Sequence, residues 1–463
     1  LRDRIRMFSN LTTIDVVIGG IVLWQTLIVS PLILITTVFP RIWLNAYFMT
    51  YMVLSTFLIT TLIIRVFLQL GAKRFIEHLR NPVLLFIGTL LAFYSMILEI
   101  IPTISAYDAT AYYLRFAVGI LKFGGMPNNL TENMIYFGDA GFRNPGIIIL
   151  YAFALFLDRW GERFKLIQIP FLILIILSTY GLAKTILKRD EYAKAAALFS
   201  AISPIFYSYI VLTGYHLDLG LVAYFFCHAY FISKFVLSDG DATAYLILSA
   251  ISSNMMLLAR EMGIIFLILL MVVIAHTSSK LRPIFLLLAI GLAFFRPVAY
   301  MVKLDETFGT YFAVAIYEAV FMTLVCVLNA KHGDKFRINL KLLIPIWIAA
   351  HLPTIAWYCR LWSMYGFLYP FVEFFVKKDI VWASEIAPLG WGEEVGPKPF
   401  SMEGFGETML QLPKMLVLPF MVGPFALFIA IGLADMIHRW YSGERSRDDL
   451  AGELIFSYIV LST

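Results

Sequence analysis

Long apolar runs recur along nearly the whole chain, and they restrict its fold more than any other feature of the sequence. A helix of about 20 apolar residues spans the roughly 30 Å hydrocarbon core of a bilayer. Inside lipid each backbone amide must be paired within the protein, so only helices and closed barrels cross a membrane. The runs are continuously apolar and do not alternate with polar residues, which argues against a β-barrel. The sequence therefore predicts an all-α, polytopic membrane protein.

The composition supports this prediction. Hydrophobic residues make up 60% of the 463 residues and charged residues only 14%, and the mean hydropathy is +0.82. Soluble domains have about 45–50% apolar and about 25% charged residues. The net charge of +5 follows from lysines and arginines in cytoplasmic loops, so it gives no reason to expect a nucleic-acid partner. Cys227, Cys326 and Cys359 lie in apolar runs without the spacing of a disulfide framework or a metal site.

We expect about 12 to 13 transmembrane helices, each formed by one apolar run. The expected spans are 15–39, 43–70, 82–102, 164–187, 193–213, 217–236, 243–259, 262–276, 283–302, 308–328, 340–362 and 412–436, with a further span beginning near 452. A cytoplasmic N-terminus places more than half of the 36 lysines and arginines on short cytoplasmic segments, as the positive-inside rule requires. These segments are 1–14, 71–81, 184–194, 234–242, 277–282, 329–341 and 437–450. The expected location is the cell membrane or an ER-type membrane.

This topology, with a cytoplasmic N-terminus, holds only if residues 144–160 do not cross the bilayer. The segment NPGIIILYAFALFLDRW is short, begins with a proline and ends in charges, so we expect an amphipathic or half-inserted external helix. Two long external loops then remain, 103–163 and 363–411. Loops of this length are usually functional. We therefore expect the functional residues on the non-cytoplasmic side.

The first external loop carries two candidate acidic positions. Asp108 follows the outer end of a span and precedes a predicted interfacial helix that has Arg115 and Lys122 on its wetter side. It is interpreted as the N-cap of that helix or as a general base held at the membrane face, and the two roles are compatible. Asp139 and Arg143 either form an ion pair within the loop or line the same site.

Two further external positions carry charged residues. His216 and Asp218 lie in a tight turn between two spans, where they either cap a helix or meet a polar substrate. Arg260 and Glu261 stand between two short apolar stretches with no loop. They either neutralise each other as a helix-capping pair, or Arg260 binds a lipid phosphate through its planar set of donors. No P-loop, GxGxxG, HExxH or CxxC sequence occurs, so nucleotide hydrolysis and structural zinc have no support.

The order of these features resembles the GT-C superfamily of membrane glycosyltransferases, and most of all its protein O-mannosyltransferase and aminoarabinose transferase branch. YDATAYY, which contains Asp108 and Tyr112, is similar to the family's acidic motif before an interfacial helix, and RNPGIIILYAFALFLDRWGERF is similar to its second juxtamembrane helix. ALFSAISPIFYSYIVLTGYHLDLGLVAYFF and ISSNMMLLAREMG are similar to the two helix pairs that follow, so the resemblance covers about 82–276. Three features depart from the family: Asp108-Ala109 replaces an acidic pair, Arg260 stands where lysine is usual, and two extra spans come first.

The resemblance implies a GT-C-like helical bundle with interfacial helices in the first external loop. It divides the chain into two additional N-terminal helices in 1–81, a catalytic core in 82–276 and C-terminal helices in 277–463. The implied reaction transfers a sugar, with inversion, from a polyprenyl (dolichyl-type) phosphate to a protein, lipid or glycan acceptor at the non-cytoplasmic face. Asp108 would be the catalytic base. The implied substrate-binding residues are Arg260, Glu261, His216, Asp218, Asp139, Arg143 and Tyr112. No cofactor is required by the sequence, and the need for a divalent cation stays open.

Two other functional classes stay open on the sequence alone. A lipid or solute transporter would have polar or broken helices near the middle of the membrane. Glu318, the Arg296-Pro297 pair and His351 are the candidates for such positions, and they do not form paired repeats. A non-catalytic subunit of a membrane complex would need no substrate cavity.

Overall fold

The structure is a computed structural model of the whole chain. It describes residues 11–79, 82–100, 113–137, 144–158, 163–202, 217–237, 243–260 and 340–365. All of these residues belong to one of the two compact units of the chain, the unit formed by Leu1–Gly263 and Asn339–Gly366. Within the described residues every regular element is helical, and β pairing is limited to one isolated bridge between Arg41 and Gly125.

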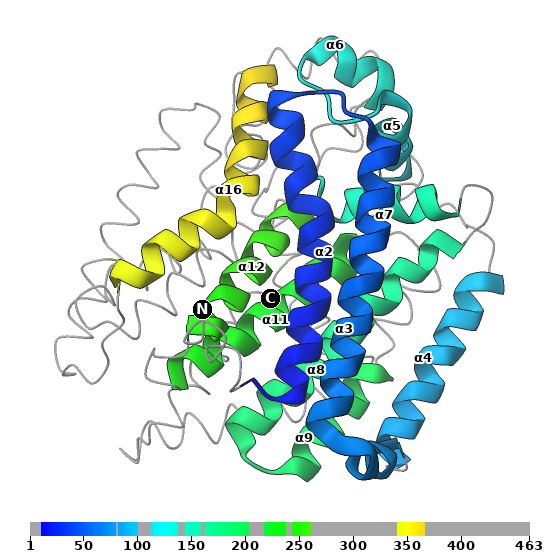
Figure 1. Ribbon diagram of the computed structural model, residues 1–463, viewed down its shortest axis with the longest axis vertical. Helices are drawn as coiled ribbons and strands as arrows, with labels where there is room; N and C mark the ends of the chain where they lie inside the picture. Colours follow the sequence, from blue (N-terminus) through cyan, green and yellow to red (C-terminus); the bar gives the residue numbers. More distant parts are fainter. Residues whose placement is uncertain are drawn as a thin grey trace, which may run out of the picture. The chain divides into compact units, whose positions relative to one another are not determined.

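The described helices follow the expected spans to within a few residues at most ends (Figure 1). The elements are α2 (Thr13–Val38), α3 (Leu44–Leu79), α4 (Pro82–Ile100), α5 (Arg115–Phe123), α6 (Leu130–Glu132), the π-helix η2 (Asn133–Phe137), α7 (Gly146–Leu157), the 3-10 helix η4 (Arg163–Ile167), α8 (Gln168–Leu187), α9 (Asp190–Ala201), α11 (Leu217–Leu237), α12 (Thr243–Ala259) and α16 (Leu340–Tyr365). Five expected spans lie outside the described residues, namely 262–276, 283–302, 308–328, 412–436 and the one near 452.

Three described stretches are long and apolar enough to cross a membrane: Thr13–Val38, Leu44–Thr61 and Lys165–Thr185. The shortest has 18 residues, which corresponds to about 27 Å at 1.5 Å per residue. The helical class of this part of the chain is therefore confirmed, and three of its helices are able to span a bilayer.

Helix α3 differs from the expected span 43–70, because it continues to Leu79 through residues that were expected to form a cytoplasmic loop. An apolar run marks only the part of a helix that lipid surrounds, and Ala, Lys, Arg and Glu of the sequence GAKRFIEHL all favour helix. Helix α4 then begins at Pro82. Proline is preferred at the first position of a helix, where its missing N–H is not needed.

Helix α7 has 12 residues, about 18 Å of helix, so it is too short to cross a bilayer. This agrees with the prediction that 144–160 does not span. The expectation of an amphipathic helix is wrong, because every residue from Gly146 to Phe153 is buried. Asn144 fixes its start by donating a hydrogen bond of 2.6 Å from Nδ2 to the backbone carbonyl of Leu257, at the end of α12. A half-inserted position for α7 stays a prediction.

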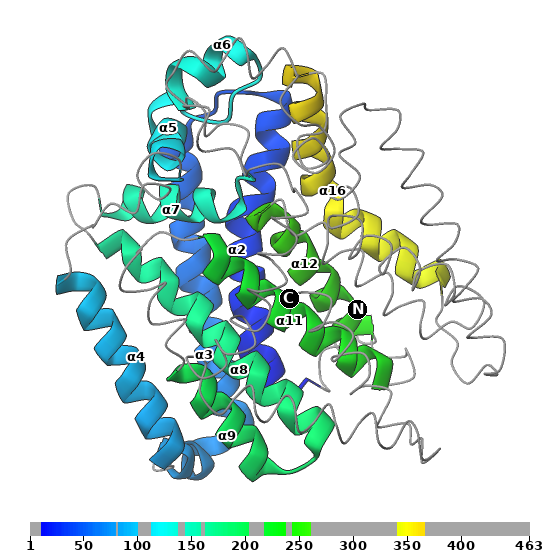
Figure 2. The same ribbon diagram turned by 180° about the vertical axis from the view of Figure 1, so that it is seen from behind.

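Helix α2 lies in the centre of this unit and contacts α3, α7, α8, α12 and α16. Its contact with α3 includes hydrogen bonds from Trp24 Nε1 to Ser55 Oγ, at 2.7 Å, and from Tyr47 to the carbonyl of Ile28, also at 2.7 Å. The two helices lie side by side in both views (Figures 1 and 2). Helix α2 also packs closely against α12 at Gly19, because a Cβ at this position would lie only 3.0 Å from the side chain of Leu248.

The contacts between helices fix their relative directions. Helices α2, α12 and α16 run the same way, because successive contacts such as Gly19 with Leu248 and Ser30 with Asn254 advance along α2 and α12 together. The hydrogen bond between His351 and Ser253, and the one that Thr354 donates to Asn254, show in the same way that α12 and α16 run in the same direction. Helices α3 and α11 run in the opposite direction. We call the end of the bundle that holds the start of α2 the Asp15 end, and the end that holds the end of α12 the Arg260 end.

Candidate functional site

Two of the predicted site residues, Arg260 and Asp218, lie among the described residues, and both are at the Arg260 end of the bundle. Arg260 itself is half-buried and follows α12 directly. Asp218 lies in the first turn of α11. The remaining predicted site residues lie outside the described residues, namely Asp108, Tyr112, Asp139, Arg143, His216 and Glu261.

The end of α12 closely contacts the segment that was predicted to form the first external loop. Besides the hydrogen bond from Asn144 to Leu257, a Cβ added to Gly146 would lie 2.7 Å from the carbonyl oxygen of Leu258. Asn144 is fully buried and directly follows Arg143 in the sequence. The structure therefore brings the segment after Arg143 against the residues that precede Arg260. A cation at the C-terminus of a helix is also favoured by the helix dipole.

Helix α5 also lies at the Arg260 end of the bundle. It is amphipathic as predicted, with Phe116, Ile120 and Phe123 buried and with Arg115 and Lys122 exposed. Whether it lies along a membrane interface stays a prediction. Its buried rings pack against neighbouring aromatic residues.

The aromatic contacts of α5 extend to η2, α16 and the α2–α3 turn. The Phe116 ring centre lies 5.2 Å from that of Phe137 and 6.5 Å from that of Trp357. The guanidinium of Arg41 lies 4.4 Å from the ring centre of Phe123, a cation–π distance. Two backbone hydrogen bonds, from Ile42 to Gly124 and from Met126 to Pro40, tie the loop after α5 to this turn. The backbone of Gly124 is left-handed with φ of 81°, which favours glycine at the end of α5.

Arg360 on α16 belongs to this end and was missed by the sequence reasoning. Its side chain is only 4% exposed, and its guanidinium lies 5.9 Å from the ring centre of the fully buried Trp357. Within the part of the chain that the structure describes, none of its three nitrogens makes a hydrogen bond. A signal was present, since an arginine inside the apolar run WIAAHLPTIAWYCRLW is rare enough to indicate function.

Polar side chains also form a buried layer between α11, α12 and α16. His228 Nδ1 lies 2.9 Å from the carbonyl oxygen of Ser249, and His351 Nε2 lies 3.1 Å from Ser253 Oγ. The hydroxyl of Thr354 donates to Asn254 Oδ1 at 2.8 Å. We call these six residues the polar layer. Its hydrogen bonds join neighbouring helices, which is a common way to hold transmembrane helices together.

The Asp15 end contains a buried carboxylate that sequence reasoning also missed. Asp15 is fully buried and accepts hydrogen bonds from Tyr230 on α11, at 2.5 Å, and from Tyr245 on α12, at 3.0 Å. It also accepts from the backbone and hydroxyl of Thr12, at 2.7 and 2.8 Å, as part of a capping box. The sequence TTID carries the signal of a capping residue followed three positions later by an acid. Asp15 thus links the start of α2 to two other helices.

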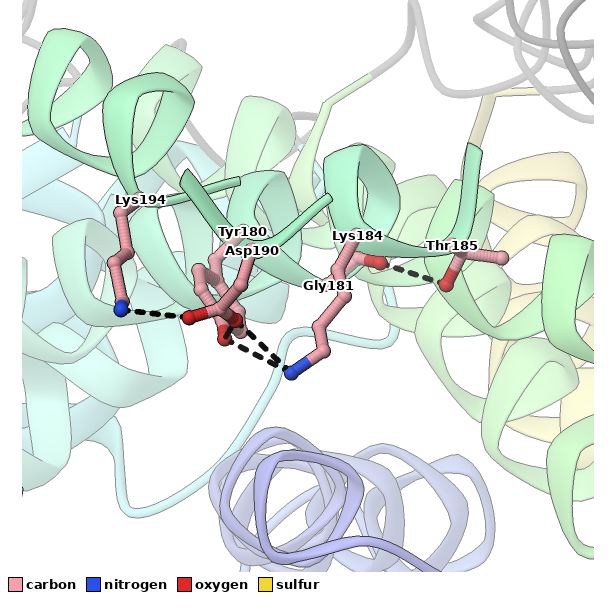
Figure 3. A network of polar contacts seen from close by, with 6 residues as sticks. All are labelled: Tyr180, Gly181, Lys184, Thr185, Asp190 and Lys194. Atoms are coloured by element: carbon pink, nitrogen blue, oxygen red, sulfur yellow. Dashed lines mark hydrogen bonds and ion pairs between the residues drawn. The ribbon is translucent and has the colours of Figure 1, made fainter. Parts of the chain in front are cut away.

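A second acidic residue organises the basic segment between α8 and α9 (Figure 3). Asp190 pairs with Lys194 at 2.7 Å and with Lys184 at 3.1 Å, and it accepts a hydrogen bond of 2.6 Å from Tyr180. Hydrogen bonds from Lys194, Tyr180 and Lys184, in this order of importance, hold the pKa of the Asp190 carboxyl well below its usual range. Two lysines of the segment 184–194, which was expected to be cytoplasmic, therefore share one carboxylate.

The described residues contain no group of three or more His, Cys, Asp or Glu side chains able to hold a metal ion. What the Arg260 end can do chemically is bind a negatively charged group next to aromatic residues, because Arg260 and Arg360 lie there with several aromatic rings. Comparisons with protein-family models, with curated proteins and with solved structures found no match.

Proposed function

We propose that the protein is a multi-pass membrane glycosyltransferase with a GT-C-like bundle of about 12–13 transmembrane helices. It would transfer a sugar from a polyprenyl phosphate to a protein, lipid or glycan acceptor at the non-cytoplasmic face. The observation that carries the proposal is a convergence of segments that resemble separate family motifs. The amphipathic helix α5, the start of α7 at Asn144 and the end of α12 before Arg260 meet at one end of the bundle.

The directions of the helices support the orientation that the proposal needs. In the topology predicted from the positive-inside rule, α2, α12 and α16 run outward through the membrane, and α3, α8 and α11 run inward. In the fold α2, α12 and α16 run together, and the end of α8 at Gly181 contacts Tyr230 near the end of α11. The Asp15 end would then be cytoplasmic and the Arg260 end external, in the cell membrane or an ER-type membrane.

The proposed reaction needs a base and a cation in one plane of the membrane. The polyprenyl chain stays in lipid, so the phosphate of the donor lies at the interface. Asp108 takes the proton of the acceptor hydroxyl, whose oxygen attacks the anomeric carbon on the side opposite the phosphate. The bond from that carbon to the phosphate oxygen breaks, and polyprenyl phosphate leaves with the bonding electrons, so the configuration inverts. Arg260 stabilises the negative charge of the departing phosphate.

Substitution of Arg260 tests the donor-binding part of the proposal. Purified full-length protein is titrated with a polyprenyl-phosphate-linked sugar, and binding is compared for Arg260→Ala, Arg260→Lys and a control. We expect Arg260→Ala to lower donor affinity by about 10- to 100-fold, as for loss of a charged hydrogen bond. Arg260→Lys should keep much of the affinity, because it keeps the charge.

The matched control is Arg189→Gln, which removes an exposed arginine at the other end of the bundle. It should bind donor as the wild type does. Equal donor affinity in Arg260→Ala and the wild type would contradict the role of Arg260 and favour a helix-capping pair with Glu261.

The polar layer favours one second candidate, a lipid or solute transporter. His228, Ser249, Ser253, Asn254, His351 and Thr354 place polar groups deep within the helical unit, where a transported solute would need them. Helix α16 is also bent near its middle (Figure 1) and contains Pro345 and Pro353. Release of entrapped sugar or labelled lipid by reconstituted vesicles, abolished by His351→Leu, would favour transport. Sugar transfer without such release would favour the enzyme.

A further inference from the structure

Two side chains on one face of α16 carry buried hydrogen-bond donors that find no acceptor in the part of the chain that the structure describes. Arg360 is 4% exposed and Trp357 is fully buried, and a spacing of three residues places them on the same face. Within the described structure, Nε, Nη1 and Nη2 of Arg360 and Nε1 of Trp357 all lack a hydrogen-bond partner. Buried donors are nearly always paired in proteins, so several unpaired donors at one place require an explanation.

The positive charge of Arg360 adds to the free-energy cost of burying these donors. A guanidinium stays protonated in proteins and has only donors to offer. A buried charge without a counter-charge is strongly destabilising, because water no longer solvates it. Among the described residues, no carboxylate pairs with Arg360. An anion with several acceptor oxygens would pair with these donors and with the charge.

We propose that Arg360 and Trp357 form a binding site for a phosphate group, supplied either by the headgroup of an anionic lipid or by free phosphate. A planar guanidinium offers two parallel donors to the oxygens of a phosphate, and the indole N–H offers another. Phosphate fits the surroundings as well as the donors. Trp357 packs against Phe116 of α5, and Asn144 lies 3.4 Å from the hydroxyl of Tyr358, so the site is at the Arg260 end of the bundle.

The surroundings of the guanidinium are aromatic. The ring centre of Trp357 lies 5.9 Å from it, and the Trp357 ring packs against Phe116, which in turn packs against Phe137. This inference concerns binding alone and does not rest on sugar transfer. It would stand if the protein were a transporter, and it would fail without affecting the roles proposed for Asp108 and Arg260.

The test measures thermal unfolding of the purified full-length protein in detergent with added dioleoyl phosphatidate. Dioleoylglycerol, which has the same chains and no phosphate, is the matched lipid control, and inorganic phosphate is a third addition. We expect phosphatidate to raise the unfolding temperature of the wild type and dioleoylglycerol to leave it unchanged. Arg360→Met should bind phosphatidate about 10- to 100-fold more weakly. Arg115→Gln, which removes an exposed arginine of α5 at the same end, should bind it as the wild type does.

The ligand-free proteins provide a second and independent readout. Because Arg360 is buried and has no hydrogen-bond partner among the described residues, Arg360→Met should unfold at a higher temperature than the wild type when no phosphate is present. Arg360→Lys keeps the charge but loses the planar pair of donors, so it should bind phosphatidate several-fold more weakly even if the methionine variant does not fold.

Each outcome has a definite meaning. An equal shift from inorganic phosphate at the same concentration would identify free phosphate as the source and keep the site. No shift of the wild type with either phosphate would overturn the proposal. A ligand-free Arg360→Met protein that unfolds at a lower temperature than the wild type would also overturn it, because the guanidinium would then have a partner within the chain.

Discussion

The hydrogen bond between Tyr230 and Asp15 should contribute measurably to the stability of the helical unit, and Tyr230→Phe removes it while leaving the ring in place. The hydroxyl lies 2.5 Å from Asp15 Oδ1, and the carboxylate is fully buried. A hydrogen bond to a charged group is worth about 1.5–3 kcal/mol in water-soluble proteins. Hydrogen bonds between transmembrane helices average about 0.6 kcal/mol and reach about 1.7 kcal/mol. A short bond to a buried charge belongs at the upper end of the membrane range, so we expect a loss of about 1–2 kcal/mol.

The loss of stability on removing a hydroxyl should differ between the two tyrosines that bind Asp15, because their hydrogen bonds differ in length and burial. Tyr245 bonds to Oδ2 at 3.0 Å and is only partly buried, so Tyr245→Phe should cost less than Tyr230→Phe. The control is Tyr192→Phe, because Tyr192 is 51% exposed and should contribute almost nothing through its hydroxyl. The free energy of unfolding is measured by denaturant titration of each purified variant in the same detergent.

A double-mutant cycle makes the test specific. Asp15→Asn keeps the size of the side chain but removes the charge that strengthens both tyrosine bonds. We expect Tyr230→Phe to cost clearly less in the Asp15→Asn background than in the wild type, because the two groups act on one another. A Tyr230→Phe protein as stable as Tyr192→Phe would refute the reasoning, since the buried carboxylate would then gain nothing from α11.

Three further predictions concern other parts of the fold. Because the pKa of Asp190 is lowered in the folded protein, its ion pairs should stabilise the fold above the usual carboxyl pKa of about 3.9 and lose this effect as the pH falls through the lowered pKa. The free energies of unfolding of the wild type and Asp190→Asn should differ by less than about 1 kcal/mol at pH 7, and this difference should shrink steadily as the pH falls below about 3.9. Gly181→Ala should lower stability by about 1–3 kcal/mol, because its Cβ would lie 2.5 Å from an aromatic ring of α11, whereas Gly88→Ala meets nothing within 4 Å and should be neutral or stabilising in the same titration. In a background without native cysteines, an impermeant thiol reagent applied to intact cells should label Gly396→Cys and not Gly333→Cys, and the reverse pattern would contradict the proposed orientation.

The sequence predicted the helices well where hydrophobicity alone decides the structure. The run 243–259 forms α12 with the same bounds, and 217–236 forms α11. An apolar segment in lipid must pair its backbone amides within itself, so it has no alternative to a helix. The end of α3 was misplaced for the opposite reason. Its last turns are polar, and helix propensity rather than hydrophobicity carries the helix to Leu79.

The contacts of polar residues were harder to predict, because they depend on which helices become neighbours. Asp15 was only the first residue of the expected span 15–39, yet it is fully buried and hydrogen-bonded to two tyrosines that lie more than 200 residues away in the sequence. Arg360 was not considered, although an arginine inside an apolar run is a signal in itself. Residues 144–160 were expected to form an amphipathic or half-inserted helix, and the burial of Gly146–Phe153 depends on contacts with the end of α12 that no local pattern reveals.

Asp108 is the residue on which the proposed enzymatic activity depends most directly. The measurement is the rate at which purified full-length protein transfers sugar from a polyprenyl phosphate donor, compared for the wild type, Asp108→Asn and the control Glu191→Gln, which changes an exposed acid at the other end of the bundle. Asparagine has the same shape and caps helices equally well, so the variant should fold and insert normally. If Asp108 is the general base, transfer should fall by about 10²- to 10⁴-fold in Asp108→Asn and stay unchanged in Glu191→Gln. Transfer by Asp108→Asn at nearly the wild-type rate would contradict the catalytic role.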